Sequence, residues 1–253
     1  MNLAAASPWS RLRCLLAECL LPARCRTCSR WLPLLLEPRQ CLRHWLCVHC
    51  LDDLQEIGPQ CCPRCGQLLL TESPTACGEC LRQPPHYDLA IASYRASGSC
   101  RSLIHQFKYQ GQRELSKLLS KALLGCFDQP RLRVLLCHGH WTLVPVPMSL
   151  SRRWRRGYNQ SLELARELSR SCGLELRCNA LRRKGGGQRQ VQLGRRQRAE
   201  NMAGKIFAAQ TDGLQNVILI DDVFTTGATA NACARVLKQS GAQKVVVISV
   251  ARG

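Results

Sequence analysis

The sequence predicts an α/β fold, in which a parallel sheet is flanked by helices and preceded by a small cysteine-rich domain. Three observations predict it. Residues 217–220 form an apolar run, and 244–251 form a second one that is apolar apart from Lys244 and Ser249; such runs are typical of strands covered on both faces of a sheet. The segment between them has apolar residues at helical spacing. Twelve of the eighteen cysteines fall before residue 81, which sets the first third of the chain apart.

The stretch VILIDDVFTTGATA, residues 217–230, combines the first apolar run with polar residues in a defined order. The strand is expected to end at Ile220, and Asp221 and Asp222 follow directly. A loop of small and hydroxyl residues comes next: Thr225, Thr226, Gly227, Ala228 and Thr229. That loop opens a helix whose apolar face carries Ala232, Val236 and Leu237.

Each residue type in this stretch has a chemical use. The first turn of a helix leaves backbone N–H groups without partners, and small residues let these donors close around a phosphate. Paired acids can accept hydrogen bonds from vicinal sugar hydroxyls or hold a divalent metal through water. The predicted ligand is therefore a phosphate beside a ribose. The alternative is a solvated pair of acids before an ordinary helix start.

Four CxxC knuckles occupy the cysteine-rich segment. Two knuckles complete an all-thiolate site for one tetrahedral zinc ion, so two structural zinc ions are predicted. Sequential or interleaved pairing both remain open, and nearby residues could replace a ligand (Cys41, His44, His49, Cys61). The predicted ligands are Cys25, Cys28, Cys47, Cys50, Cys62, Cys65, Cys77 and Cys80.

Three segments are predicted along the chain: an amphipathic N-terminal helix within 1–24, a double zinc ribbon at 25–83, and an α/β domain at 84–253 that begins after Pro84-Pro85. Within the last segment, periodicity predicts strands at 87–94 and 142–147. Helices are expected around Leu103 to Phe107, from 113 to about 127, and from Asn159 to about 172.

The chain is strongly basic, with a formal net charge of +19. The excess is densest in 152–205, which holds 15 basic and 4 acidic residues. Such a surface indicates a polyanion partner, either nucleic acid or a phosphorylated metabolite, although a solvated basic face is the alternative. Knuckle-spaced cysteines favour a reducing cytoplasm. No transmembrane helix is expected, and Glu18 interrupts the apolar run that would otherwise mimic a secretory leader.

Two basic stretches are candidate anion-binding segments. The first is expected to be a loop after the 142–147 strand, and it carries Arg152, Arg153, Arg155 and Arg156. The second, residues 182–198, has three consecutive glycines and reads as a mobile loop. The aromatic residues Trp141, Trp154 and Tyr158 lie near basic residues, so they are candidates to stack on single-stranded bases or, alternatively, to pack in the core.

The motif DDVFTTGAT resembles the phosphoribosyl-pyrophosphate (PRPP) loop of type I phosphoribosyltransferases. Together with VPVP, RRGYNQS and the CxxC-rich front end, it makes nearly the whole chain resemble the ComF/GntX family, which are competence-associated, phosphoribosyltransferase-like proteins with an N-terminal double zinc ribbon. A later family signature is matched by Gln190, Leu193, Arg198 and Asn201, before Phe207.

This resemblance implies a type I phosphoribosyltransferase-like sheet and a set of site residues. Asp221 and Asp222 would hold the ribose and act as the catalytic acids, and residues 225–229 would hold the 5′-phosphate of PRPP, which binds with Mg²⁺. Pyrophosphate or DNA would be bound by Arg152, Arg153, Arg155, Arg156 and Arg198.

Three functions are compatible with these residues. The favoured one is a PRPP-site protein that binds single-stranded DNA during DNA uptake in natural transformation or during DNA utilisation. It would be cytoplasmic, and a helicase or channel partner would bring it to the inner face of the membrane. The alternative is an active phosphoribosyltransferase, for which the sequence shows no acceptor pocket. The third is a zinc-stapled scaffold that binds a protein partner alone.

Overall fold

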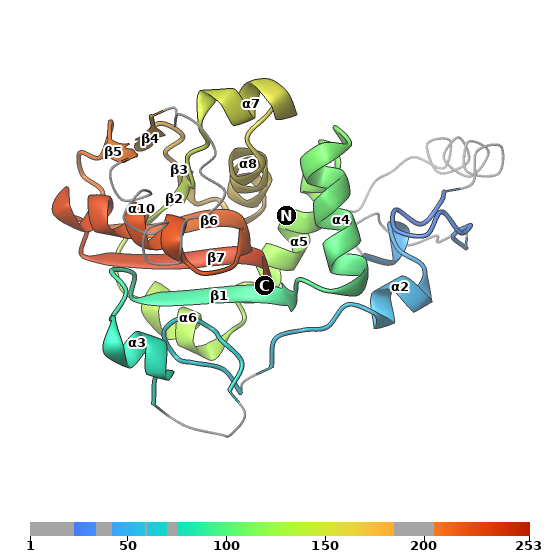
Figure 1. Cartoon of the computed structure of the whole chain (residues 1–253), viewed down its shortest axis with the longest axis horizontal. Coiled ribbons are helices and arrows are strands. Elements are labelled where there is room, and N and C mark those ends of the chain that lie inside the picture. The colour runs from blue at the N-terminus through green and yellow to red at the C-terminus, as the bar shows by residue number, and fades with distance from the viewer. Residues whose placement is uncertain (1–22, 34–41, 59, 70–74, 185–204) are drawn as a thin grey trace, which may run out of the picture. The chain divides into compact units, whose positions relative to one another are not determined.

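The structure is a computed structural model that describes residues 23–33, 42–58, 60–69, 75–184 and 205–253 (Figure 1). The chain divides into two compact units, residues 1–54 and 55–253. The helix expected within 1–24 lies outside the described residues. So do Cys41 and most of the 182–198 stretch, including Gln190, Leu193 and Arg198, as well as Asn201 of the family signature.

The same small motif occurs once in each unit. In both copies a CxxC turn is closed by an antiparallel bridge, and a second CxxC begins a five-residue helix. The turn hydrogen bonds repeat as well: Cys25 N–H donates to Arg30 O (2.7 Å), and Cys62 N–H donates to Gln67 O (2.7 Å). The helices are α2 (Val48–Asp52), preceded by η1 (Leu42–His44), and α3 (Gly78–Arg82).

The larger unit contains a five-stranded sheet in the order β1-β7-β6-β2-β3, and every adjacent pair of strands is parallel. The predicted parallel sheet flanked by helices is therefore confirmed (Figure 1). The strands are β1 (Leu89–Arg95), β7 (Lys244–Arg252), β6 (Asn216–Phe224), β2 (Trp141–Pro145) and β3 (Glu175–Leu176).

Strand β6 is longer than the sequence predicts. It continues past Ile220 because β7 offers partners further along: Asp221 pairs with Ser249, and Phe224 pairs with Arg252. The two acids thus belong to the end of the strand rather than to the loop after it. Their backbone positions are fixed by the sheet, which is more precise than a loop would be.

Six longer helices and one hairpin complete the described part of the larger unit. The predicted helix after Asn159 is confirmed, since the Asn159 side chain accepts from Ser161 N–H (3.1 Å) at its N-terminus. The helices are α4 (Gly98–Tyr109), α5 (Leu115–Cys126), α6 (Pro130–Leu136), α7 (Leu150–Arg156), α8 (Gln160–Cys172) and α10 (Ala228–Gln239); the hairpin pairs β4 (Leu181–Arg183) with β5 (Ile206–Ala208).

The sheet is buried on both faces. Val217 and Leu219 of β6 belong to one buried cluster with the apolar face of α10, including Ala232. Because strand side chains alternate, Ile218 and Ile220 point to the other face, where α5 and α8 contact the sheet. This two-sided burial explains why the strands read as continuous apolar runs.

After the neighbouring strands β2 and β6, the chain continues toward opposite edges of the sheet. Helix α8 carries it from β2 outward to β3, whereas α10 carries it from β6 to β7 over the opposite face. In open α/β sheets, such a reversal leaves a crevice at the carboxyl ends of the two strands, where ligands bind. The fold therefore points to the segments that follow Pro145 and Ile220.

Among the described residues, no helix has both the length and the apolar character needed to cross a membrane.

Candidate functional site

Asp221 and Asp222 lie at the carboxyl end of β6, beside the end of β2. Asp221 Oδ1 accepts hydrogen bonds from Ser161 Oγ (3.1 Å) and from Asp222 N–H (2.9 Å). Ser161 lies in the first turn of α8, so this contact joins α8 to the end of β6. Ser161 is the final serine of RRGYNQS, a motif that the sequence placed near this edge without giving the serine a role.

Asp222 forms an ion pair with Lys108, whose Nζ lies 2.9 Å from Asp222 Oδ1. Both side chains are largely buried, with 18% and 11% of their surfaces exposed. The sequence pattern does not indicate this contact, because the two residues lie 114 positions apart in the chain. Lys108 belongs to the site because it is the cation that balances Asp222.

The pKa of Asp221 is raised well above its ordinary value. Burial raises its pKa, and the charge of Asp222 raises it further, while Lys108 and the two hydrogen bonds lower it, leaving a pKa of about 7. Near neutral pH the carboxyl can therefore either accept or donate a proton. A buried carboxyl with a pKa raised by burial and by a neighbouring charge is typical of functional sites.

This raised pKa predicts that the protein loses stability as pH rises toward neutrality. The folded protein keeps the Asp221 proton up to about pH 7, whereas the unfolded chain releases it near pH 3.8. The protonated carboxyl therefore contributes its full stabilisation of the fold below pH 3.8, and this contribution is lost as the pH rises through about 7. Between pH 5.5 and 8, wild type should lose on the order of 2 kcal/mol more than Asp221→Asn. Urea unfolding of both proteins at a series of pH values checks this, and parallel curves would contradict it.

Residues 225–229, the predicted phosphate loop, lead from β6 into α10. Gly227 has a left-handed backbone (φ +73°) and directly precedes the helix, which begins at Ala228. Thr225 and Thr226 are exposed, and Thr226 Oγ1 accepts from Ala228 N–H (3.4 Å). The other N–H groups of the first turn of α10 lack acceptors within the helix, and such groups can bind an anion at the carboxyl edge of the sheet.

The four arginines after β2 lie in a helix, and the expected loop is wrong. Arginine and leucine have high helix propensity, so residues 150–156 form α7, which ends at Gly157 (φ +80°). Arg152, Arg153 and Arg155 are exposed. Arg156 is engaged elsewhere: its guanidinium lies over the Tyr109 ring (4.9 Å) and donates to the Tyr109 hydroxyl (3.2 Å). Arg198 lies outside the described residues.

Of the three candidate stacking aromatics, Trp154 alone is available. It lies on α7 with 93% of its surface exposed, between Arg153 and Arg155. The stacking role is wrong for Trp141 and Tyr158, which are 3% and 8% exposed and pack in the core. The strand pattern of TLVPVP could have assigned Trp141 to the interior, since β2 is buried along its whole length.

Arg183 is a basic residue near the acids, and it belongs to the 182–198 stretch that the sequence marked as a candidate anion-binding segment. It ends β4, and burial lowers its pKa, as does the charge of Arg152, whereas Asp221 raises it. Arg183 therefore lies within electrostatic range of both the acids and α7. The sequence did not indicate that Arg183 lies near Asp221, because the two residues are 38 positions apart and are brought together by the fold.

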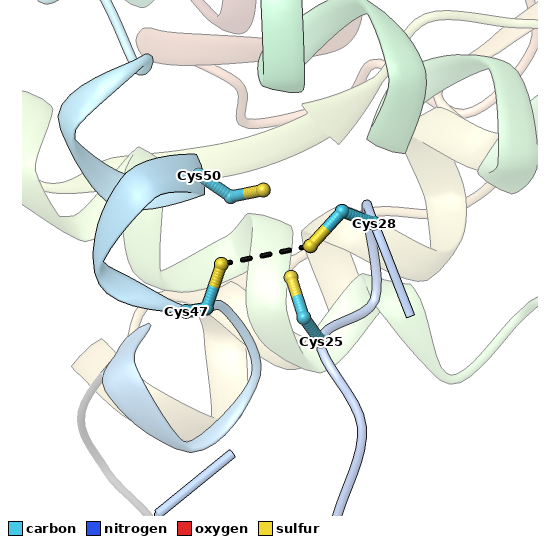
Figure 2. Close-up of side chains that lie close together, drawn as sticks. All are labelled: Cys25, Cys28, Cys47 and Cys50. Carbon is cyan, nitrogen blue, oxygen red and sulfur yellow. Dashed lines mark hydrogen bonds between the residues drawn. The ribbon is translucent and has the colours of Figure 1, made fainter. Parts of the chain in front are cut away.

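The eight knuckle cysteines form two groups, paired in sequential order. Within each group the sulfur atoms lie within 4.8 Å of one another. Figure 2 shows the four side chains of the first group, with their sulfur atoms gathered together. Sγ–Sγ distances are 3.6 Å for Cys28–Cys47 and 3.7 Å for Cys65–Cys77. The first cysteine cluster is Cys25, Cys28, Cys47 and Cys50, and the second is Cys62, Cys65, Cys77 and Cys80.

Both clusters fit a tetrahedral metal ion such as Zn²⁺. A Zn–S bond of about 2.3 Å separates ligand sulfurs by about 3.8 Å, close to the spacing found. Burial raises the pKa of the Cys62 thiol, but backbone hydrogen bonds from its neighbours outweigh burial and lower the pKa to about 6, and the same holds for Cys25. The backbone thus favours the thiolates of Cys25 and Cys62, whereas burial raises the pKa of Cys65 and Cys80, whose deprotonation would depend on the metal itself. With four thiolates and no open position, either ion would be structural.

Comparison with known proteins gives relatives along most of the chain. Competence protein F of Haemophilus influenzae is 29% identical over 214 residues, covering 83% of this chain and 91% of that protein. DNA utilization protein YhgH of Escherichia coli is 31% identical over 220 residues, covering 83% and 92%. Competence protein ComFC of Bacillus subtilis is 26% identical over 206 residues, covering 78% and 79%.

Two further comparisons add little. No protein-family model matches the chain. Among solved structures, phosphoribosylpyrophosphate synthetase from Mycobacterium smegmatis aligns with 53% of this chain and 33% of its own, at 15% identity and a TM-score of 0.28. The sequence relatives are therefore the evidence for identity. With 31% identity to a relative of which 92% is covered, the chain belongs to the ComF family.

Proposed function

We propose that this protein binds PRPP or a related ribose phosphate at the carboxyl edge of its sheet, binds single-stranded DNA over α7, and acts in DNA uptake or DNA utilisation. The observation that carries the first part is the order of groups at one sheet edge: Asp221 and Asp222 on β6, then a left-handed Gly227 that opens α10. The names of the relatives support the DNA role.

In this proposal the two acids bind the ribose. Ribose 2′- and 3′-hydroxyls would donate to the carboxylates of Asp221 and Asp222, and the ion pair with Lys108 would hold the Asp222 side chain in place. The 5′-phosphate would accept from the first-turn N–H groups of α10 and from Thr225 and Thr226. Mg²⁺ would come with PRPP, held by its pyrophosphate and ribose oxygens.

The pyrophosphate end of the ligand would lie toward the basic residues. Arg183 and Arg152 lie on the side of Asp221. Their positive charge would offset the negative charge of a diphosphate that binds next to two carboxylates. Without such charge, the acids would repel the ligand they are meant to bind. The basic residues of α7 and β4 would thereby connect the ribose phosphate site to the DNA-binding surface.

The DNA-binding surface is α7. Three exposed arginines and a tryptophan exposed over 93% of its surface combine phosphate contacts with a stacking platform, the pairing that single strands require. The protein would work in the cytoplasm, with a helicase or channel of the DNA-uptake machinery bringing it to the membrane.

Replacing Trp154 should weaken single-strand binding without changing the fold. Trp154→Ala is expected to lower affinity for a labelled oligonucleotide about tenfold, because base stacking contributes about 1–3 kcal/mol per base. Trp154→Phe should recover most of the loss, and Val134→Ala, which trims another exposed apolar side chain, should have no effect. Arg152→Gln should reduce the slope of log affinity against log salt by about 0.7. Equal affinity of Trp154→Ala and wild type would contradict this surface.

One titration tests both parts of the proposal together. PRPP with Mg²⁺ and a labelled single strand are added separately and then jointly to the full chain, and calorimetry and fluorescence anisotropy are measured. We expect both ligands to bind, with coupling between them because the basic residues are shared. Binding of neither, with recovery of a protein partner, would instead favour the scaffold function.

A second candidate is an active phosphoribosyltransferase. The specific observation that favours it is the Asp221 pKa of about 7, which suits a proton exchange during the reaction. Pyrophosphate released from PRPP only when DNA or a nucleobase is added would establish turnover. Binding of PRPP with no release would leave the site as a binding or regulatory one.

A further inference from the structure

The second cysteine cluster is attached to the strands that position the phosphate loop. Its four cysteines belong to the same buried cluster as Tyr87 and Phe224. The first knuckle of the cluster is fixed to β1, where Ala90 N–H donates to Arg64 O (2.7 Å). A Cβ on Gly66 would lie 2.9 Å from Ala90 O, so the knuckle packs directly on the strand.

Arg252 connects this cluster to the end of β6. It is the last residue of β7 and lies opposite Phe224 in the sheet. Its Nη2 donates to Cys65 Sγ (3.8 Å), and its guanidinium lies over the Phe224 ring, 4.8 Å from the ring centroid. One side chain therefore contacts both a metal-ligand sulfur and the aromatic ring that precedes the phosphate loop.

Phe224 in turn defines the turn at Gly227. Its Cζ lies 2.7 Å from the position that a Cβ on Gly227 would take, and the Tyr87 hydroxyl lies 3.3 Å from the same position. Tyr87 and Phe224 meet edge to face, with centroids 5.8 Å apart. The left-handed turn therefore rests directly on the ring, and a shift of the ring would move the first N–H groups of α10.

We propose that Arg252 is a positioning residue that links the second cysteine cluster, through Phe224, to the conformation of the phosphate loop. This inference rests on the proposed function only in taking residues 225–229 as the phosphate site. A metal-held thiolate is a fixed anionic acceptor, so it anchors the guanidinium on the ring. The consequence is that the second cluster, and not the first, controls ligand binding.

The two units provide a matched comparison. In the smaller unit the guanidinium of Arg24 lies over the Trp31 ring, 3.8 Å from its centroid, next to the first cysteine cluster. Arg252→Gln and Arg24→Gln therefore each remove an arginine–aromatic contact beside a cysteine cluster. Arg252→Lys keeps the charge but loses the planar guanidinium, and it serves as the conservative variant.

The experiment measures three quantities on the full chain: zinc content by native mass spectrometry, the PRPP dissociation constant by calorimetry, and amide hydrogen exchange of residues 225–231. Arg252→Gln should keep two metal ions, raise the dissociation constant about tenfold, and speed exchange in this segment several-fold. Arg252→Lys should fall between Arg252→Gln and wild type. Arg24→Gln should match wild type in all three quantities.

Two results would overturn the proposal. One is unchanged PRPP binding and exchange in Arg252→Gln; the other is loss of the second metal ion in that variant, since the loop would then respond to the missing cluster rather than to Arg252. If wild type binds no PRPP, the proposed function fails instead, and exchange of residues 225–231, which needs no ligand, still decides whether Arg252 positions the loop.

Discussion

Gly227→Ala is expected to weaken PRPP binding by a factor of about 30 or more and to lower the free energy of unfolding by about 2–3 kcal/mol. Two costs combine at this position. An alanine with φ near +73° costs about 1–2 kcal/mol in backbone strain. Its Cβ would also lie 2.7 Å from Phe224 Cζ, inside contact distance, so the ring or the turn must move. Either movement displaces the first-turn N–H groups that would hold the phosphate.

A second glycine separates these two costs. Gly173 ends α8 with the same left-handed φ of +73°, but a Cβ there would meet nothing within 4 Å. In urea unfolding, Gly173→Ala should therefore lower the free energy of unfolding only by the backbone strain, about 1–2 kcal/mol. It should bind PRPP like wild type. Calorimetry on both variants provides the comparison. Wild-type affinity in Gly227→Ala would show that the turn carries no ligand contact.

The local parts of the site could be predicted from the sequence because each is encoded within a few residues. The order of apolar strand, two acids and a small-residue turn before a helix is a contiguous pattern, and Val217 to Ala230 follow it apart from the longer strand. The CxxC knuckles are equally local. Sequential pairing was one of two open alternatives, and the repeated turn and helix of each copy bring neighbouring knuckles together.

The remaining parts depend on contacts between distant segments. The extension of β6 through Phe224 comes from β7, and the burial of Tyr158 comes from Phe107, whose carbonyl accepts its hydroxyl. Arg252 is the last residue of strand β7, and nothing around it in the sequence connects it to Cys65. Periodicity indicates which face of an element is buried, but it does not indicate which charged residue lies across that face.

Lys108→Met should be the most destabilising single change at the ion pair, costing about 3 kcal/mol. The Asp222 side chain is only 11% exposed, and the substitution removes the cation that pairs with it. Leaving a buried charge without a partner lowers the stability of the fold by more than the ion pair itself contributes. Asp222→Asn in the same protein should restore much of the loss, because the remaining amide is neutral. Urea unfolding of wild type, both single variants and the double variant gives the coupling energy directly.

The control is a second lysine–aspartate pair of equal length at the opposite end of the sheet. Lys238 Nζ lies 2.9 Å from Asp88 Oδ2, but these side chains are 29% and 30% exposed, so Lys238→Met should cost less than about 1 kcal/mol. Asp222→Asn should also weaken PRPP binding at least tenfold, since a hydrogen bond to a charged acceptor contributes about 1.5–3 kcal/mol. An unchanged PRPP dissociation constant in Asp222→Asn would remove the ribose-binding assignment and leave the ion pair as a purely structural contact between α4 and β6.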